Sequence, residues 1–159
     1  MDAVFKKLNL KEQKTIVVLN APESFQANLD SIRQEKEILT SLNHVSHLDF
    51  ILVFVTQQSE IDYLIPTIGD LLEGDATLWM CYPKGTSKKY KADFNRDTGW
   101  QVMGSYDLEP VRMVAIDEDW SALRFKKVDF IKSMKRSSSS ALSDKGKTKA
   151  GRIDGTRTT

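Results

Sequence analysis

Three runs of apolar residues without polar alternation constrain the fold of this chain more than any other feature. Residues 15–20 and 49–56 are rich in β-branched and aromatic side chains, and residues 76–83 form a third run. A half-exposed strand alternates apolar with polar residues, whereas a strand that is buried on both faces does not. The three runs therefore predict a largely parallel sheet with a covering layer on each face.

The segment behind the second run has the periodicity of an amphipathic helix. Ser59 with Asp62 predicts a capped start. Pro66 is expected to kink this helix or to move its effective start, and Gly74 is expected to end it. The apolar positions that follow the i, i+3, i+4, i+7 spacing are Ile61, Leu64, Ile65, Ile68, Leu71 and Leu72.

The remaining segments complete a chain of alternating strands and helices that ends in a hairpin. The turn at residues 117–120 is so short that the last two strands must be antiparallel. The pattern predicts a single layered α/β domain. The other expected elements are a helix at 2–8, a helix near 23–34, a weak strand near 37–41, helical spacing over 94–106, and strands at 111–116 and 121–128.

Length and charge divide the chain into a body and a tail. Its 159 residues suffice for one domain. Residues 135–159 hold seven basic residues against Asp144 and Asp154, while residues 1–134 carry 16 bases and 20 acids. The tail lacks aromatic residues and contains four consecutive serines, so it cannot bury enough apolar surface to offset its backbone entropy. We predict a Rossmann-like α/β domain over 1–134 and a basic, disordered tail over 135–159.

Several kinds of site that have recognisable sequence patterns are missing. The turn at residues 19–24 contains no glycine, and the chain has no G-x-G-x-x-G motif, P-loop or G-x-S-x-G elbow. Cys81, His44 and His47 do not supply the ligand set of a zinc site, so we predict no metal. Cys81 lies inside the third apolar run and is expected to be a small buried hydrophobe.

The number of cysteines and the lengths of the apolar runs also indicate the cellular compartment. A lone cysteine makes no internal disulfide, which favours a reducing cytoplasm. No apolar run approaches the length of a membrane-spanning helix, and residues 1–7 lack the pattern of a signal peptide. We therefore expect a cytoplasmic protein with no membrane partner.

Polar and aromatic residues stand at the ends of the predicted strands. Ligands of doubly wound sheets bind outside the carboxyl ends of the parallel strands. Asn20, Thr56 and Lys84 stand at the ends of the three runs, and Trp120 belongs to the turn that reaches the same edge. We predict a ligand-binding site formed by these four residues and assign no catalytic role to any residue.

A lysine-rich loop lies beside this predicted site. Such a loop suits a small anion, a nucleotide or single-stranded nucleic acid. The alternative is a solvated loop whose lysines pair with acids, and residues 117–119 are the candidates. Beyond Lys84, the charged and aromatic residues of the 84–96 loop are Lys88, Lys89, Tyr90, Lys91, Asp93, Phe94 and Arg96.

Four segments, residues 17–25, 54–56, 78–84 and 114–125, resemble a small bacterial protein family of unknown function. The resemblance covers roughly residues 4–134 and leaves out the tail. Members look like trimmed class I methyltransferase-type Rossmann domains, and this likeness transfers no activity. Together with the pattern above, it implies a three-layer Rossmann-like α/β sandwich with a six-stranded mixed sheet, order 2-1-3-4-6-5, whose last strand is antiparallel. Where such enzymes set a glycine-rich turn against the cofactor, this chain has Asn20-Ala21-Pro22. The resemblance thus implies that S-adenosylmethionine does not bind in its usual pose.

These patterns favour a non-catalytic Rossmann-like binding or interaction domain, without a cofactor, over an enzyme. Two alternatives stay open. One is a divergent methyltransferase-like or nucleotide-cofactor enzyme that lacks a glycine turn. The other is a weak nucleic-acid binder that uses the 84–96 loop and the basic tail. The expected partner is a small anionic ligand or another protein.

Overall fold

The computed structural model describes residues 1–131, 141–143 and 146. Within these residues, no helix combines the length and apolarity that a membrane crossing requires. In chain order the elements are α1 (Ala3–Lys7), β1 (Thr15–Leu19), the 3₁₀ turn η1 (Glu23–Phe25), α2 (Gln26–Asp30), β2 (Glu37–Leu39), β3 (Leu48–Phe54), α3 (Gln58–Leu71), β4 (Leu72–Pro83), α4 (Gln101–Gly104), β5 (Leu108–Ala115), β6 (Trp120–Lys127) and the 3₁₀ turn η2 (Val128–Phe130).

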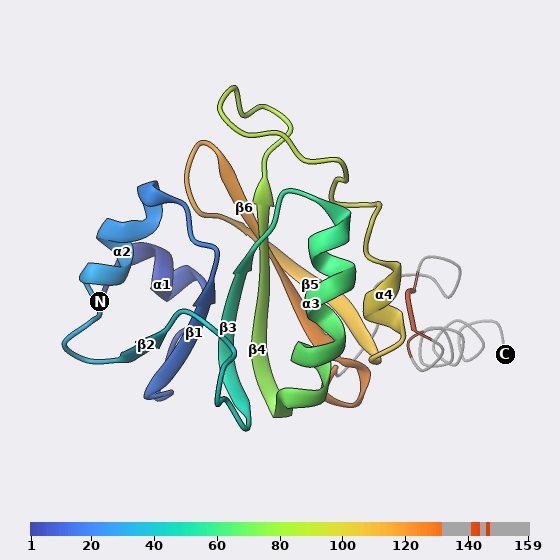
Figure 1. Ribbon diagram of the computed structural model, residues 1–159, viewed down its shortest axis with the longest axis horizontal. Coiled ribbons are helices and arrows are strands. Elements are labelled where there is room, and N and C mark those ends of the chain that lie inside the picture. The colour runs from blue at the N-terminus through green and yellow to red at the C-terminus, as the bar shows by residue number, and fades with distance from the viewer. Residues whose placement is uncertain (132–140, 144–145, 147–159) are drawn as a thin grey trace, which may run out of the picture.

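The six strands form one sheet in the order β2-β1-β3-β4-β6-β5 (Figure 1). β1 pairs in parallel with β2 and β3, and β3 pairs in parallel with β4. β6 is antiparallel to both of its neighbours, β4 and β5. The predicted α/β sandwich is confirmed, with its strand order and antiparallel last strand.

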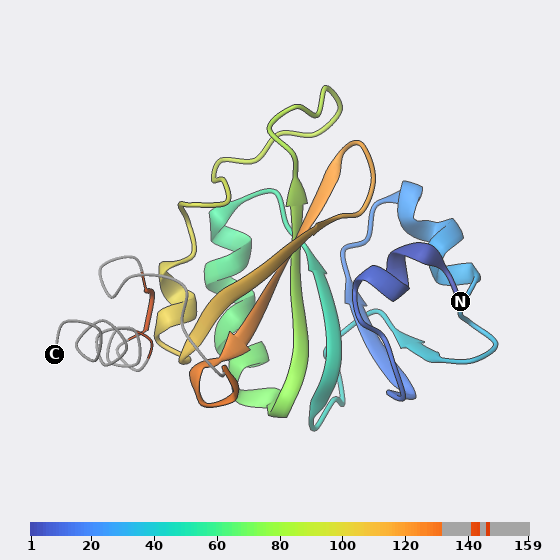
Figure 2. The same cartoon turned by 180° about the vertical axis from the view of Figure 1, so that it is seen from behind.

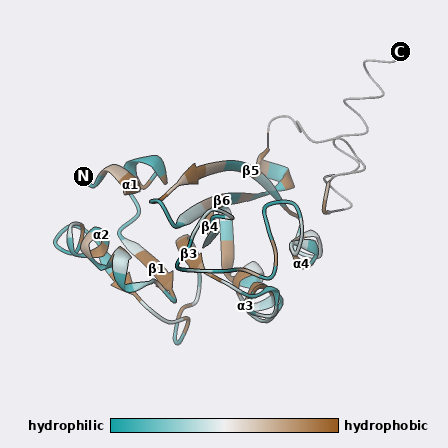
Figure 3. Ribbon diagram, turned by 90° about the horizontal axis from the view of Figure 1, so that it is seen from above, coloured by the Kyte–Doolittle hydropathy of each residue, from teal (hydrophilic) through white to brown (hydrophobic). Residues whose placement is uncertain are grey.

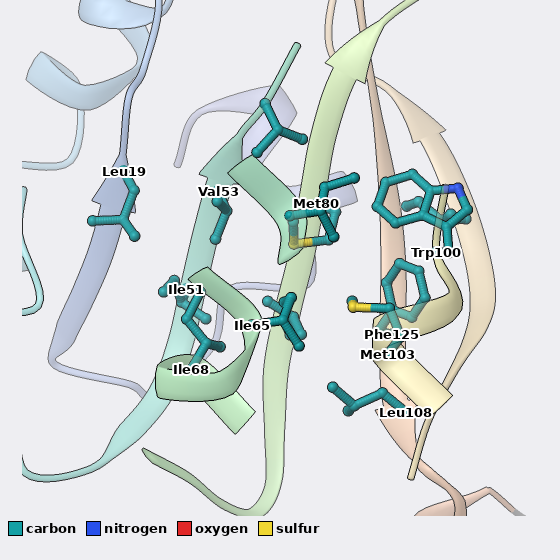
Figure 4. Packing of buried hydrophobic residues seen from close by; sticks show 14 of the residues in the cluster. Leu19, Ile51, Val53, Ile65, Ile68, Met80, Trp100, Met103, Leu108 and Phe125 are labelled. Carbon is teal, nitrogen blue, oxygen red and sulfur yellow. The ribbon is translucent and has the colours of Figure 1, made fainter. Parts of the chain in front are cut away.

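Both faces of the sheet are covered, as the apolar runs require. Seen from above, α3 and α4 lie on one side of the sheet and α1 lies on the other (Figure 3). On the first side, Ile65 and Ile68 of α3 point toward Ile51, Val53 and Met80 of the central strands (Figure 4). These side chains are excluded from water, and their burial supplies the main free energy that holds α3 in place.

On the other face, aromatic side chains form the core. The Phe5 ring of α1 lies 5.6 Å from Phe25, whose ring is 5.1 Å from Phe54 of β3. Trp79 of β4 is 1% exposed, and its indole Nε1 donates a hydrogen bond of 2.9 Å to the Leu8 carbonyl. This bond ties the end of α1 to the middle of the sheet, and Figure 2 shows α1 against the strands from behind.

The bounds of α3 differ from the prediction. The N-cap is Gln57 and its partner in the capping box is Glu60, not Ser59 with Asp62. Pro66 lies inside the helix as predicted, but the helix ends at Leu71. Gly74 belongs to β4, where its φ of +55° suits a residue without a side chain. The helix ends earlier because the chain enters the extended strand directly at Leu72.

The predicted helix over residues 94–106 is mostly irregular, and only α4 is helical. Gly99, with φ +95°, interrupts the segment before α4. The spacing of Trp100 and Met103 instead reflects burial of both side chains against the sheet. The Trp100 indole N–H donates to the Asn95 carbonyl at 2.9 Å, which holds the irregular backbone in shape.

Most of the predicted tail, residues 135–159, lies outside the described residues. The described part, residues 141–143 and 146, contacts Glu109 of β5, whose carboxylate is fully buried. The Glu109 carboxylate accepts hydrogen bonds from the Leu142 amide at 2.8 Å and from the Ser143 amide and hydroxyl, the latter at 2.7 Å. Gly104 lies against the Leu142 carbonyl with no room for a side chain. These residues thus pack on the outer edge of the sheet.

Candidate functional site

The four residues predicted to form a site lie along one edge of the sheet. Asn20 follows β1, Thr56 comes two residues after β3, Lys84 follows β4 and Trp120 begins β6. These strands are neighbours in the sheet, and Pro83 pairs directly with Trp120. The loop after β4 and the turn between β5 and β6 both rise from this edge (Figures 1 and 2). The structure therefore places all four residues along the carboxyl edge, but they do not line one cavity.

Asn20 keeps the backbone conformation that a glycine turn needs. Its φ is +61°, in the left-handed region that glycine favours and asparagine tolerates. Its side chain is exposed. Pro22 follows two residues later and has no amide hydrogen to donate. The turn after β1 therefore has a left-handed residue at Asn20, where glycine is favoured, and offers no backbone donor at Pro22.

Thr56 is used mainly by the protein itself. Its amide and hydroxyl both donate to Glu60 Oε1, at 2.9 and 3.3 Å, and Glu60 also accepts from the Gln57 amide. Asp93, from the loop after β4, accepts from the Gln58 amide at 2.7 Å, and its own amide donates to the Thr56 carbonyl. Two carboxylates thus occupy the positive end of α3, and Asp93 fastens the loop to it.

The Trp120 side chain is buried among aromatic rings and is not exposed for contact with a ligand. It is 3% exposed, with the Phe54 ring at 5.2 Å and the Tyr90 ring at 4.9 Å. The Asp117 carboxylate accepts from the Trp120 amide at 2.8 Å and sets the tight turn before it. The indole Nε1 of Trp120 is buried without a hydrogen-bond partner among the described residues. The Trp120 side chain, predicted to contact a ligand, thus packs in the core beside this edge, and its orphan donor faces the interior.

A cavity of about 580 Å³ lies at the carboxyl end of β4, under the lysine-rich loop. Lys84 is the only one of the four predicted site residues among its lining residues. Its far wall comes from β5 and β6, because Ser121 pairs with Tyr82 across the sheet. The lining residues are Tyr82, Pro83, Lys84, Gly85, Thr86, Tyr90, Lys91, Ala92, Phe94, Asn95, Arg96, Asp97, Met113 and Ser121.

The cavity combines cations with a buried hydroxyl. Arg96 lies 3.6 Å from Asp97, and both side chains are largely exposed. The ion pairs within the described part of the chain involve neither Lys84 nor Lys91. Tyr82 is 5% exposed, and burial raises the pKa of its hydroxyl, while the charge of Arg96 lowers it and that of Asp97 raises it. Sequence analysis missed Tyr82 because its position in an apolar run indicated only core.

A second hollow lies on the other side of the same loop. Lys88 and Lys89 line it together with Glu118 and Asp119 of the β5–β6 turn. The Asp119 carboxylate also accepts a hydrogen bond from the Ser87 hydroxyl at 2.8 Å, which joins the turn to the loop. Acids and lysines therefore line the same part of the edge, although the ion pairs within the described residues include none between them.

Of the residues that were set aside on sequence grounds, His44 and His47 lie away from this edge, whereas Cys81 lies near it in β4. His44 and His47 are exposed in the segment before β3, and the described residues contain no cluster of three or more metal-ligating side chains. Cys81 is fully buried, and desolvation raises the pKa of its thiol far above the ordinary value. Cys81 therefore packs as the predicted small hydrophobe.

Solved structures of other proteins share this fold. A SAM dependent methyltransferase from Aquifex aeolicus matches with a TM-score of 0.50 and 13% identity, covering 78% of this chain and 87% of the other. The pyocyanin biosynthetic protein PhzM matches with a TM-score of 0.52 and 10% identity, covering 79% of this chain and 54% of the other. No protein-family model and no curated protein sequence matches the chain.

These similarities show a methyltransferase-like Rossmann fold. They also correct the functional prediction: the non-catalytic binding or interaction domain is wrong, as is the preference against an enzyme. The solved chain from Aquifex aeolicus, matched over most of its length, is a SAM dependent methyltransferase. The alternative of a divergent methyltransferase-like or nucleotide-cofactor enzyme fits this finding better.

Proposed function

We propose that this protein is a divergent methyltransferase-like enzyme that binds a nucleoside-type cofactor at the carboxyl edge of its sheet without a glycine turn. The observation that carries the proposal is the sheet itself, in which β6 lies antiparallel between β4 and β5. The likeness to the SAM dependent methyltransferase from Aquifex aeolicus supports it. In open α/β sheets, ligands bind outside the carboxyl ends of the parallel strands.

The residues at this edge do not fit S-adenosylmethionine in the glycine-turn pose. Pro22 removes a backbone donor, and the Asn20 side chain occupies space that a glycine leaves empty. Dinucleotide-binding folds use an acidic residue at the second strand to hold the ribose. Here Thr40 and Ser41 follow β2 instead. A nucleoside-type cofactor therefore needs other contacts, and the Asn20 carboxamide with these two hydroxyls supplies the exposed polar groups at the ends of β1 and β2.

Ligand-dependent thermal unfolding of the full chain tests the proposal. The panel contains S-adenosylmethionine, S-adenosylhomocysteine, nucleotides and dinucleotides. A ligand at about 100 times its dissociation constant stabilises the folded state by about 2.7 kcal/mol, which raises the melting temperature of a domain of this size by several degrees. We expect such a shift with at least one adenosine-containing compound, followed by a stoichiometric calorimetric titration.

A matched pair of variants distinguishes the loss of a cofactor-binding site from a general effect of a bulky side chain on the fold. Asn20 and Asn9 both have positive φ, +61° and +62°, and both are exposed, but Asn9 follows α1 before the amino end of β1. Asn20→Trp is expected to weaken cofactor binding tenfold or more, whereas Asn9→Trp leaves it unchanged. A flat panel, or equal losses in the two variants, would contradict the proposal.

Two finer predictions remain proposals. Membership of the small bacterial family rests on the residues of segments 17–25 and 114–125. A cytoplasmic location is supported by the single cysteine, Cys81, which is buried and unpaired in the structure.

A further inference from the structure

We propose that the cavity at the carboxyl end of β4 binds a small aromatic compound that carries an oxyanion, such as an aryl phosphate or an aryl carboxylate. We further propose that a compound of this class is the acceptor substrate of the enzyme. Its oxyanion would attack the methyl carbon of a nucleoside-type methylsulfonium cofactor, so that an O–CH3 bond forms while the S–CH3 bond breaks and its electron pair stays on the sulfur of the departing thioether. The second statement rests on the proposed function, whereas the binding site stands on the cavity alone. Three features of the walls support it: a buried hydroxyl, unpaired cations and aromatic rings.

The buried hydroxyl belongs to Tyr82. More than nine-tenths of this residue is buried, and its hydroxyl donates to the Met113 sulfur at 3.3 Å. A thioether is a weak acceptor, so the hydroxyl lacks a partner of normal strength. Both residues line the cavity. A ligand oxyanion beside Tyr82 therefore offers a stronger, charge-assisted hydrogen bond than the sulfur does.

The charge of the cavity selects an anion. Lys84, Lys91 and Arg96 line it against a single acid, Asp97. Lys84 is half-buried and forms no ion pair with a described residue, so its charge is screened less than that of an exposed lysine. An oxyanion neutralises this excess positive charge.

The remaining walls suit a planar ring. Tyr82 and Phe94 lie with ring centroids 5.9 Å apart, and the Trp100 ring packs against both at 5.8 and 5.2 Å. Tyr90 adds a further ring to the lining. Aromatic rings prefer offset or edge-to-face neighbours at these distances. The volume of about 580 Å³ falls in the usual range for small-molecule sites.

The same observations favour a small anion over a nucleic acid. A nucleic-acid strand needs a continuous positive track along its phosphates. Beyond the cavity, Lys88 and Lys89 line a hollow together with Glu118 and Asp119, so two acids accompany the two lysines there. The positive excess is therefore confined to the cavity.

Methyl NMR of the full chain, labelled at its methionines, tests the site without any cofactor. The Met113 side chain is 45% exposed and lines the cavity, whereas Met103 is fully buried beneath it. Phenyl phosphate, benzoate and neutral phenol are titrated in turn. We expect the Met113 methyl to shift with the first two, at least fivefold more tightly than with phenol, and the Met103 methyl to move less. Comparison of phenyl phosphate with benzoate shows which oxyanion the site prefers.

Two variants and a control assign the contacts. Tyr82→Phe removes only the hydroxyl and keeps the ring that packs on Phe94, and Lys84→Gln removes the charge at similar size. Each substitution is expected to weaken the binding of phenyl phosphate fivefold or more and to leave the binding of phenol unchanged. Lys88→Gln makes the same charge change in the same loop outside the cavity, so it is expected to have no effect.

Several outcomes would overturn the site. These are no Met113 shift, equal affinity for phenol and phenyl phosphate, and unchanged phenyl phosphate binding in both cavity variants. A further one is a thymidine oligonucleotide that binds more tightly than phenyl phosphate and is weakened by Lys88→Gln. If phenyl phosphate binds while every cofactor titration fails, the anion site stands and the assignment as an acceptor falls with the proposed function.

Discussion

Trp79 joins α1 to the sheet through one buried hydrogen bond, and Trp79→Phe removes that bond while an aromatic ring stays in place. The Leu8 carbonyl, on a fully buried residue, then loses the indole N–H that lies 2.9 Å away. An orphaned buried acceptor costs about 1–3 kcal/mol. The smaller ring leaves roughly 40 Å³ unfilled, which at about 24 cal/mol per Å³ costs about 1 kcal/mol. We expect the free energy of unfolding to fall by about 2–4 kcal/mol in total.

Urea unfolding followed by far-UV circular dichroism measures this loss, and the melting temperature should fall by about 5–15 °C. Trp100→Phe is the matched control. It removes an equivalent bond to the Asn95 carbonyl, but Asn95 is exposed, so water can replace the indole donor. The control is expected to cost less, about 1–2 kcal/mol. Equal losses in the two variants, or a loss below 1 kcal/mol for Trp79→Phe, would refute the reasoning.

Three further predictions concern packing, loop attachment and pH. Gly69→Ala puts a methyl group into the Tyr106 ring and should cost about 1–3 kcal/mol in urea unfolding. Asp93→Ala removes the carboxylate that accepts from the Gln58 amide, which should cost about 0.5–2 kcal/mol and speed protease cleavage of the loop after β4. Burial raises the pKa of the Cys81 thiol, so iodoacetamide should label the native chain far more slowly than the unfolded chain. Because burial raises the pKa of Cys81 in the folded chain, the contribution of this thiol to the free energy of unfolding is complete below its unfolded pKa of about 8.5. As the pH rises above that value, the unfolded chain loses the proton while the folded chain keeps it, so the free energy of unfolding declines.

The structure supplies a control variant for the first two of these predictions. Gly85→Ala adds a methyl group where no atom lies within 4 Å and should be nearly neutral. Asp97→Ala removes an exposed acid from the same loop and should leave unfolding unchanged within about 0.5 kcal/mol. Native labelling of Cys81 at the rate found in urea, or equal effects of a variant and its control, would contradict the corresponding prediction.

Local sequence patterns predicted an element correctly where the residues of that segment alone determine its structure. The run that became β3 is buried along nearly its whole length, which only a strand covered on both faces allows. The turn before Trp120 was recognisable because so short a connection allows only an antiparallel hairpin. In the structure the Asp117 carboxylate accepts hydrogen bonds from the amides two and three residues on. In α3 the apolar periodicity was correct, but the start was misplaced. Glu60 reaches back to Gln57, so the capping box begins two residues before Ser59.

Local sequence patterns gave wrong or incomplete predictions where a structure depends on contacts between segments that are far apart in the sequence. The spacing of Trp100 and Met103 satisfies a helix, yet a contact with the sheet explains it equally well. Local periodicity does not distinguish these two cases, because both bury side chains at regular intervals. Tyr82 and Ser121 form one wall of the cavity although 39 positions separate them in the sequence, since antiparallel pairing of β4 and β6 brings them together.

The sequence by itself determined the layers, the closing hairpin and the edge at which Asn20, Thr56, Lys84 and Trp120 lie, and its resemblance to a known family added the strand order. Runs and turns are properties of neighbouring residues, and sheet topology follows from them with few alternatives. Only the tertiary structure decided which of these residues line a cavity. The Thr56 hydroxyl donates a hydrogen bond to Glu60, and Trp120 is buried among aromatic rings. Of the four predicted residues, only Lys84 lines the cavity. A side chain's availability depends on partners that folding brings from elsewhere in the chain, and no local pattern encodes them.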